Sequence, residues 1–318
     1  MTTETRPADP TAEYRMLHDL QPVVAENLDR HLAVAKEWFP HEYVPWSAGR
    51  DFEGPLGGEP WTPAEEKLPE VARISLVVNL LTEDNLPGYH FAIAQFGKDG
   101  AWGSWVDRWT AEEDRHGTAL RDYLLATRAV DPRALERARM DHMSGGYRRP
   151  DGFSALHAIA YAAFQELATR ISHRNTGLQS RDAVCDALLA RIAADENLHM
   201  LFYRNLVDAA FELDADAAMR AVADVVIGFE MPGSTIKDFG RKSAQIAMAG
   251  IYDTRLHHDD VVQPILRQLR VFERGGLGPA GEQAREELAA FTTALDTAAR
   301  SFTERRDAIL AARAKRAG

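Results

Sequence analysis

The 318-residue chain contains a single cysteine, Cys185, so it can form no intrachain disulfide. Such scarcity is typical of proteins that work in a reducing compartment. Long apolar runs are missing too: no stretch of about 18 apolar residues occurs, so we expect no membrane span. The polar opening MTTETRPADPTAEY also lacks the apolar core of a secretory signal. Together these absences predict a cytoplasmic protein.

Positive charge is the next shortage, because acidic residues outnumber basic ones and the formal net charge is −11. Proteins that bind nucleic acids usually carry a basic surface, so we expect no nucleic-acid partner. An acidic protein partner is compatible with this charge, since a local basic patch can bind one. The chain is 45% hydrophobic and 27% charged, which is typical of a globular protein with a large core.

Clear runs of alternating polar and apolar residues, the pattern of β-strands, are absent as well. Apolar residues instead recur at helical spacing, and proline- and glycine-rich stretches separate the segments. We predict an all-α protein in which a disordered start (1–11) precedes one domain (12–318). The predicted helices span about 12–39, 62–96, 105–130, 154–173, 179–212 and 280–315, with shorter ones between 214 and 280.

Several local signals refine this pattern. The segment Thr62-Pro63-Ala64-Glu65 has the form of a capping box and predicts the start of a long helix, which Pro87 should kink. Segments 97–104 and 143–153 are predicted to be turns or loops. Residues 257–260 (HHDD) could bind a metal ion, but adjacent residues on a helix point about 100° apart, which favours a solvated turn.

Two short segments, TAEEDRH and AADENLH, each contain the motif Glu-x-x-His. The motif pairs Glu113 with His116 and Glu196 with His199. Residues at i and i+3 share one face of a helix, so each pair can contact one target. One such motif alone is a weak signal, because the residues can simply face solvent.

The two motifs belong to a longer repeat. Glu83 precedes Glu113 by the same interval in the sequence as Glu166 precedes Glu196, so one constant shift in numbering superimposes the two sets. Two helical hairpins then each offer a glutamate followed by Glu-x-x-His in the same register. Ferritin-like bundles that bind two iron or manganese ions use this set of side chains. We therefore predict a ferritin-like four-helix bundle with additional helices.

The residue types of this set suit a particular chemistry. Carboxylates and imidazoles favour iron or manganese over the metals that prefer thiolates, and carboxylates can bridge two ions. Open positions on the ions are left for dioxygen. Glu112 and Asp195 also match across the repeat. We expect them to accept hydrogen bonds from the ligand histidines across the site, with solvent exposure as the alternative.

Four segments resemble motifs of the soluble acyl-acyl carrier protein desaturases of plant plastids and actinobacteria. TEDNLPGY, WTAEEDRHG, FQELATRISHRNT and AADENLH are similar to TEEALPTY, WTAEENRHG, FQERATFISHGNT and AADEKRH, in the same order. The resemblance covers about residues 15–215. It implies a homodimeric, O2-dependent enzyme of fatty acid biosynthesis that holds two iron ions, with manganese as the alternative metal. Ferredoxin would supply electrons, and a cis double bond would enter an acyl chain carried by acyl carrier protein.

The resemblance also assigns roles to individual residues. The six metal ligands are Glu83, Glu113, His116, Glu166, Glu196 and His199. Thr169 falls on a threonine beside the dioxygen pocket, with a threonine bonded to its own helix as the alternative. Trp38 matches a tryptophan of an electron path that reaches the ligands through Asp195. Trp109 is a candidate counterpart, and core packing is the alternative for both tryptophans.

Substrate contacts follow from the same resemblance. Ala92, Phe96, Ala158 and Ile159 fall where the family lines its acyl cavity. They do not reproduce the plant pattern, so chain length and double-bond position stay open. Arg30 and Lys36, near the Trp38 end of the first helix, are candidates for a carrier-protein surface, with ordinary surface charge as the alternative.

Other functions compatible with the site also stay open. A di-iron acyl hydroxylase would use the same ligands, and only product analysis separates it from a desaturase. A ferroxidase or iron-storage protein should assemble a hollow shell, which the extended C-terminal third argues against. A dimer in size-exclusion chromatography would oppose a cage. A degenerate binding protein is disfavoured by the complete ligand set.

Overall fold

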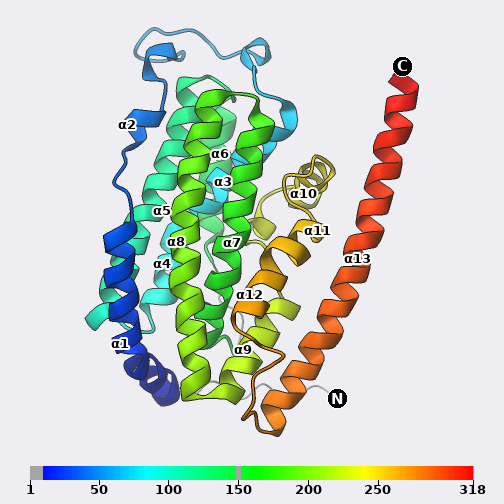
Figure 1. Cartoon of the computed structure of the whole chain (residues 1–318). Helices are drawn as coiled ribbons and strands as arrows, with labels where there is room; N and C mark the ends of the chain where they lie inside the picture. The colour runs from blue at the N-terminus through cyan, green and yellow to red at the C-terminus, as the bar shows by residue number, and fades with distance from the viewer. Residues whose placement is uncertain (1–9, 148–151, 318) are drawn as a thin grey trace.

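The computed structural model describes residues 10–147 and 152–317, and these ranges are mostly helical (Figure 1). No strand occurs within them, and their only β contact is an isolated bridge between Phe52 and Glu59. The all-α prediction is therefore confirmed. The helices are α1 (Pro10–Val34), α2 (Pro40–Tyr43), α3 (Glu70–Asp84), α4 (Leu86–Ala94), α5 (Gly100–Ala126), α6 (Pro132–Gly145), α7 (Ala155–Ser180), α8 (Ala183–Leu213), α9 (Ala215–Ile227), α10 (Phe239–Met248), α11 (Thr254–Leu256), α12 (Gln263–Gln268) and α13 (Pro279–Ala317).

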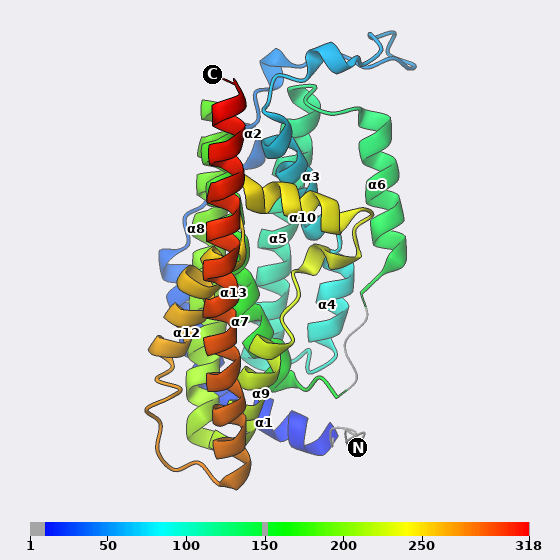
Figure 2. The same cartoon turned by 90° about the vertical axis from the view of Figure 1, so that its right-hand side faces the viewer.

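Four long helices, α3, α5, α7 and α8, form the central bundle. Helix α7 packs along α8, α3 lies between α7 and α5, and α5 contacts α8 to close the ring. Helix α1 covers α5 and α8 (Figure 1). Helix α6 packs on α3 and lies at the outer edge of the molecule (Figure 2). The 39-residue α13 packs on α9 and α11.

A polar layer crosses the bundle core between two apolar clusters. Along α5, Trp105 and Val106 belong to one cluster and Leu120 and Leu124 to the other. Helix α8 repeats this order in reverse, because it runs antiparallel to α5. Two apolar clusters, whose large side chains each contribute about 1.5–3 kcal/mol on burial, thus hold the polar side chains between them.

Three predicted boundaries in the first third were wrong. The helix expected at Thr62 begins instead at Glu70: the capping box forms, with Thr62 N donating to Glu65 Oε1 at 3.0 Å, but it caps only a 3₁₀ turn. The expected kink at Pro87 is a break, because α3 ends at Asp84 and Pro87 sits in the first turn of α4, where its missing N–H costs little. Part of the turn expected at 97–104 is the start of α5.

Other segments also differ from the prediction. Helix α6 was not predicted, although the Asp131 side chain accepts hydrogen bonds from two N–H groups of its first turn. It includes 143–145, which were expected to be loop. Residues 257–260 do not form a solvated turn: they lie in a π-helical turn between α11 and α12, with His258 buried. The predicted disordered start lies mostly outside the described residues, but Pro10 and Thr11 are helical.

Candidate metal centre

The six side chains of the repeated motif meet in the polar layer. Glu83 comes from α3, Glu113 and His116 from α5, Glu166 from α7, and Glu196 and His199 from α8. None is more than 7% exposed. Their donor atoms form two groups of four, each within 4.8 Å: Glu83, Glu113, His116 and Glu196; and Glu113, Glu166, Glu196 and His199. The groups share Glu113 and Glu196, so two ions could sit side by side between common carboxylates.

Several facing atoms of this cluster have no hydrogen-bond partner among the described residues. They are Glu113 Oε1, His116 Nδ1, Glu166 Oε2, Glu196 Oε1 and His199 Nδ1. His199 Nδ1 lies 2.8 Å from Glu113 Oε1, and His116 Nδ1 lies 3.5 Å from Glu196 Oε1. Buried polar atoms without partners are costly, and buried charges normally pair or coordinate metals. The cluster is therefore suited to a metal site.

The electrostatics of the cluster indicate the same need for a cation. Burial raises the pKa of Glu83 well above its usual value, and the negative charge of Glu113 raises it further. The same two causes raise the pKa of Glu166. Burial also opposes ionisation of Glu113, but the imidazoles of His116 and His199 outweigh it and lower that pKa. A bound cation favours the ionised form of every carboxylate here.

His199 is held from behind by Glu112. Its Nε2 lies 2.8 Å from Glu112 Oε2, while its Nδ1 faces the cluster. His31 of α1 contacts the same carboxylate at 3.0 Å, and Arg108 pairs with it. Burial raises the pKa of Glu112, but the hydrogen bonds from His199 and His31 outweigh it and lower the pKa below its usual range.

His116 is held in the same way by Asp195, from the other half of the bundle. The distance from His116 Nε2 to Asp195 Oδ2 is 3.4 Å. Trp38 Nε1 donates to that oxygen at 2.7 Å, and Arg115 donates at 2.8 Å. Burial raises the pKa of Asp195, but the hydrogen bond and charge of His116, together with Trp38 and Arg191, outweigh it, and the pKa falls to about 2. Glu112 and Asp195 are thus buried acceptors of histidine N–H groups, each across the site.

The two remaining glutamates have different supports. Trp109 Nε1 donates to Glu166 Oε1 at 3.0 Å, so this tryptophan contacts the cluster without an intervening acid. His173 of α7 lies with Nε2 3.1 Å from Glu83 Oε1, and its Nδ1 lies 3.2 Å from Asn79 Nδ2. Burial lowers the pKa of His173 to about 4, so its imidazole is neutral at pH 7 and donates from Nε2.

Thr169 contacts both the cluster and its own helix. Its Oγ1 lies 3.0 Å from Glu196 Oε2, and also 3.1 Å from the carbonyl of Glu166 in its own helix. The hydroxyl can therefore switch its proton between the cluster and the helix backbone. Its repeat counterpart, Leu86, has no polar side-chain atom.

An apolar cavity leads to the cluster. Glu83, Glu113 and Trp109 line its inner end. The other lining residues are Thr82, Leu86, Tyr89, Ala92, Ile93, Phe96, Tyr147, Phe153, Ala158, Tyr161, Ala162, Gln165, Tyr203 and Pro232. Three of the four predicted cavity residues are thus at its wall. Ile159 is not: it faces the core from α7 and is 1% exposed.

Arg30 and Lys36 lie on the surface, as a docking role would require, and Lys36 stands just before the buried Trp38 in the sequence. None of the described helices has the length and apolarity to cross a membrane.

Comparison with known proteins places this site in a family. The family profile described as "Fatty acid desaturase" matches residues 12–316. The chain belongs to the fatty acid desaturase family. Its resemblance to that family, inferred from four motifs, is confirmed over nearly the whole chain.

Relatives in this family occur in bacteria and plants. A Mycobacterium tuberculosis protein named as a putative acyl-acyl carrier protein desaturase, DesA1, is 48% identical over 91% of this chain and 88% of its own length. The chloroplastic acyl-acyl carrier protein desaturase 4 of Oryza sativa is 34% identical over 90% of this chain and 76% of its own length. The X-ray structure of DesA2 from Mycobacterium tuberculosis matches with a TM-score of 0.70 and 30% identity, covering 85% of this chain and 99% of that one.

Two buried histidines of this family member were not predicted from the sequence. His31 continues the apolar stripe of α1 formed by Leu20 and Val24, and a polar residue on such a stripe is a detectable signal. His173 follows Thr169 and Glu166 at helical spacing, on the same face of α7. Helical spacing from known site residues could therefore have found both.

Proposed function

We propose that this chain is an acyl-acyl carrier protein desaturase that inserts a cis double bond into a saturated acyl chain at a dinuclear iron site. The observation that carries the proposal is the apolar cavity that ends at a cluster of four carboxylates and two imidazoles. The family and the names of the relatives support the substrate class.

The metal ions would be held by the six clustered side chains, Glu83, Glu113, His116, Glu166, Glu196 and His199. Two divalent ions bring four positive charges, which match four ionised carboxylates. Iron would supply the reduction of dioxygen and the oxidation of two adjacent C–H bonds. Manganese accepts the same ligands, so metal analysis of active protein must distinguish the two.

The protein's own part is to bind, orient and exclude water. Ala92, Ala158 and Phe96 line a cavity whose apolar wall favours an acyl chain and whose inner end brings methylene groups to Glu83 and Glu113. The overall balance consumes the acyl chain, O2, two electrons and two protons, and releases the alkene and two water molecules. Thr169 Oγ1 would carry a proton to or from Glu196 Oε2, and the 3.0 Å contact between the two atoms supports this role.

The resemblance to the acyl-acyl carrier protein desaturases also suggests partners. Ferredoxin would bring the electrons, acyl carrier protein would present the chain, and the enzyme would work as a homodimer. Arg30 and Lys36 are exposed candidates for contact with the carrier. Trp38, hydrogen-bonded to Asp195 and stacked near His116 at a ring distance of 6.2 Å, is a candidate for the electron path, and Trp109 for a second contact to the ligands.

Mass spectrometry of acyl chains tests the proposal. Iron-loaded protein receives a ladder of acyl-acyl carrier proteins, reduced ferredoxin and air. Loss of two hydrogens from one chain length is the expected result and names the preferred substrate. Gain of one oxygen without desaturation would indicate a hydroxylase instead. Assembly of a large hollow shell in size-exclusion chromatography, with no change of the acyl chains, would favour iron storage.

A further inference from the structure

A second cavity reaches the candidate metal centre, between α3, α7, the segment 230–235 and α10. Its volume is about 640 Å³. The buried Glu83 and Thr169 line its inner end, while Ser234 and Thr235 on its walls are exposed. The cavity therefore extends from the cluster to the surface, and we call it the α10 cavity.

The α10 cavity meets the cluster from the opposite direction to the apolar cavity that would hold the acyl chain (the acyl cavity). Along α7, Ala162 and Gln165 of the acyl cavity precede Glu166, whereas Thr169 and Ser172 of the α10 cavity follow it. Each residue of an α-helix advances about 1.5 Å along the axis, so the two cavities lie on opposite sides of the level of Glu166.

Helix α3 shows the same arrangement. It runs antiparallel to α7, because Ser75 contacts Thr176 at 2.7 Å and Asn79 contacts His173 at 3.2 Å. Asn79 lines the α10 cavity and not the acyl cavity, while Glu83 lines both. An acyl chain that fills the acyl cavity therefore leaves the α10 cavity open to the cluster.

The segment 230–235 forms a wall between the two cavities. Pro232 lines the acyl cavity, and the buried Gly233 lines the α10 cavity. A Cβ atom on Gly233 would lie 3.4 Å from Thr82 Oγ1, so the segment lies directly against α3. Tyr161, from the wall of the acyl cavity, donates its hydroxyl hydrogen bond to the carbonyl of Glu230 at 2.9 Å. The wall is thus fixed to both α3 and α7.

The side chains of the α10 cavity suit a small neutral molecule. Val78, Phe239 and Ile246 supply apolar surface. The polar groups of α3 and α7 satisfy each other, since Ser172 Oγ donates to Asn79 Oδ1 at 3.1 Å. Dioxygen is small, uncharged and apolar, so such walls admit it without the cost of removing a charge from water.

Charged side chains on the described walls are restricted to the two ends of the α10 cavity. Glu83 belongs to the cluster, and Glu230 is exposed. Lys237, Arg241 and Lys242 are close in the sequence but do not line the cavity. An uncharged molecule is little affected by any of these charges, so they oppose neither its entry nor its exit.

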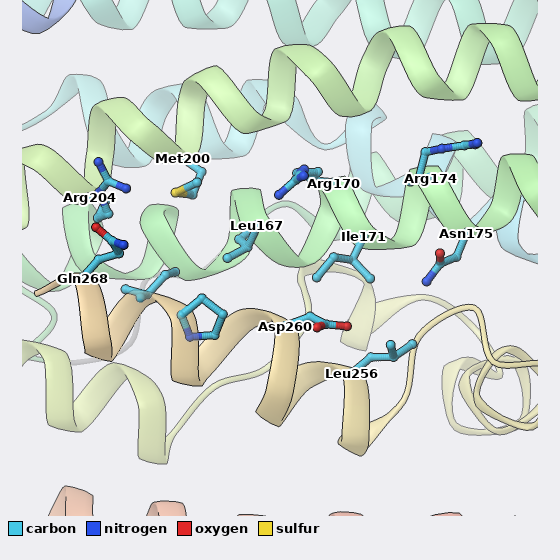
Figure 3. A pocket seen from close by; sticks show the side chains of 12 residues that line it. Leu167, Arg170, Ile171, Arg174, Asn175, Met200, Arg204, Leu256, Asp260 and Gln268 are labelled. Carbon is cyan, nitrogen blue, oxygen red and sulfur yellow. The ribbon is translucent and has the colours of Figure 1, made fainter.

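Two other hollows on the molecule fit this role less well. Figure 3 shows one between α7, α8 and the segment from α11 to α12; among the described residues, none of the six candidate ligands lines it. Its charged wall residues are Arg170, Arg174, Arg204 and Asp260 (Figure 3). A groove between α4, α5 and α6 does reach Glu83, but the ion pair of Arg139 and Asp84 lies on its wall.

We propose that dioxygen reaches the candidate metal centre through the α10 cavity while the acyl chain occupies the acyl cavity. This inference rests on the proposed function, which requires O2 at the cluster together with a bound chain. The two water molecules that the reaction releases leave by the same route. Thr169, whose Oγ1 contacts Glu196, stands where this route reaches the cluster.

Xenon binding tests the route without metal or substrate. Xenon is an apolar probe of protein cavities, and crystals of metal-free wild-type protein under xenon pressure should hold it in the α10 cavity. Ser243 is half-buried on the wall and bonds to the carbonyl of Gly240 in its own helix. Ser243→Trp should fill the space and exclude xenon. Ala244→Trp, at the next, exposed position, is the matched control and should keep it. Xenon in the acyl cavity alone would overturn the inference.

Stopped-flow oxidation tests the route in the loaded protein. Reduced, iron-loaded protein with bound acyl-acyl carrier protein is mixed with limiting O2, and the absorbance of the metal centre is followed. Ser243→Trp should slow the reaction about tenfold, because a packed interior leaves few other voids for passage, and Ala244→Trp should match wild type. Higher O2 should restore the rate of Ser243→Trp.

A second closure and a product assay complete the test. Thr235→Trp fills the same cavity from the segment 230–235, so it replaces Ser243→Trp if that variant does not fold. Wild-type rates in variants whose crystals exclude xenon from the α10 cavity would overturn the inference. Wild-type protein that reacts with O2 through this route but leaves acyl chains unchanged would instead overturn the desaturase proposal and leave the route standing.

Discussion

The two halves of the bundle carry the same donor residues but surround them differently. In the first half, Glu83 is supported by a neutral histidine, His173, and in the second, Glu166 is supported by Trp109. His173 also lines one cavity with Asn79 and Ser172, whereas Trp109 lines a different one. The repeat therefore creates two equivalent sets of donors, and the helices around it make the two ends chemically distinct.

The two acids that contact the ligand histidines from behind, Glu112 and Asp195, show the same contrast. Glu112 and Asp195 are repeat partners, yet Glu112 bonds to His31 and Asp195 to Trp38. Both His31 and Trp38 precede the repeat in the sequence and have no counterpart within it. Asymmetry of this kind gives two metal positions different environments, which suits a reaction with one substrate side and one solvent side.

Removal of a metal-binding side chain should give the largest effect. It should also show which carboxylates serve both metal ions. Glu113 belongs to both donor groups, whereas Glu83 belongs to one. Glu113→Ala should therefore lose both ions and nearly all activity, while Glu83→Ala should keep about one ion per chain. Metal-to-protein ratios measured by plasma mass spectrometry check this. Equal metal content in the two variants would contradict the shared role of Glu113, and Glu83→Asp serves as the conservative control.

Removal of one supporting N–H donor should weaken one end of the site only. His173→Phe and Trp109→Phe both keep an aromatic ring and delete the hydrogen bond to Glu83 or Glu166. Each should weaken one of the two metal positions by about tenfold to a hundredfold. Competition with a chelator gives the two affinities. Equal weakening of both positions by either variant would show that the halves are not independent.

Metal affinity should rise with pH. Burial lowers the pKa values of His116 and His199, but Asp195 and Glu112 with the cluster carboxylates outweigh it and raise both. This proton binding stabilises the metal-free fold below the unfolded value of about 6.5, and the contribution is lost as pH rises through the raised folded pKa values. A metal ion must displace these protons, so its affinity should increase about tenfold per pH unit for each proton released.

Variants of Glu112 and Asp195 test the cause of this pH dependence. Glu112→Gln removes the charge that raises the pKa of His199, and Asp195→Asn does the same for His116. Both should shift the rise of metal affinity to lower pH, as titration of metal uptake at several pH values will show. An unchanged profile in both variants would mean that these acids do not control the protonation of the histidines.

The smallest effect should come from Thr169, whose hydroxyl has no counterpart in the other half of the repeat. Thr169→Val keeps the shape and removes the contact to Glu196, a hydrogen bond worth about 1 kcal/mol, or about fivefold in rate. Metal content should stay unchanged, while less double bond forms per O2 consumed. Leu86→Thr, at the repeat counterpart, is the matched control and should not compensate for Thr169→Val. If Thr169→Val formed as much double bond per O2 consumed as the wild type, a role for the hydroxyl would be excluded.

Helix identity could be predicted far better than helix boundaries. The apolar periodicity identified α7 and α8, but α5 begins at Gly100 because Asp99 and its neighbours form a first turn that the glycines obscure. Similarly, α6 packs on α3 with a mostly polar surface, of which only Leu135 and His142 are buried. A helix with so few apolar residues is easily missed until its packing partner is known.

The candidate site, too, could be predicted from the sequence only in part. Glu-x-x-His is a local pattern, so one helix face determines which side chains point together, and the constant shift between the two motifs reveals the second half. The support of Glu83 by His173 joins residues 90 positions apart, and that of Glu112 by His31 joins residues 81 apart. Such contacts depend on the rotation of one helix against another, which no local spacing specifies.

The sequence by itself therefore determined the class of fold through helical periodicity, and the six donor residues through a motif that repeats at a constant shift in numbering. The resemblance to a family came separately, from four matching segments. Only the tertiary structure decided that Ala158, Ala162 and Gln165 of α7 line the apolar cavity at the cluster, whereas Leu167 and Arg170 line a different concave surface. It also decided that Ile159 turns into the core while its neighbour Ala158 lines the cavity. Successive residues of a helix diverge by about 100°, so function at each position depends on which neighbour packs there.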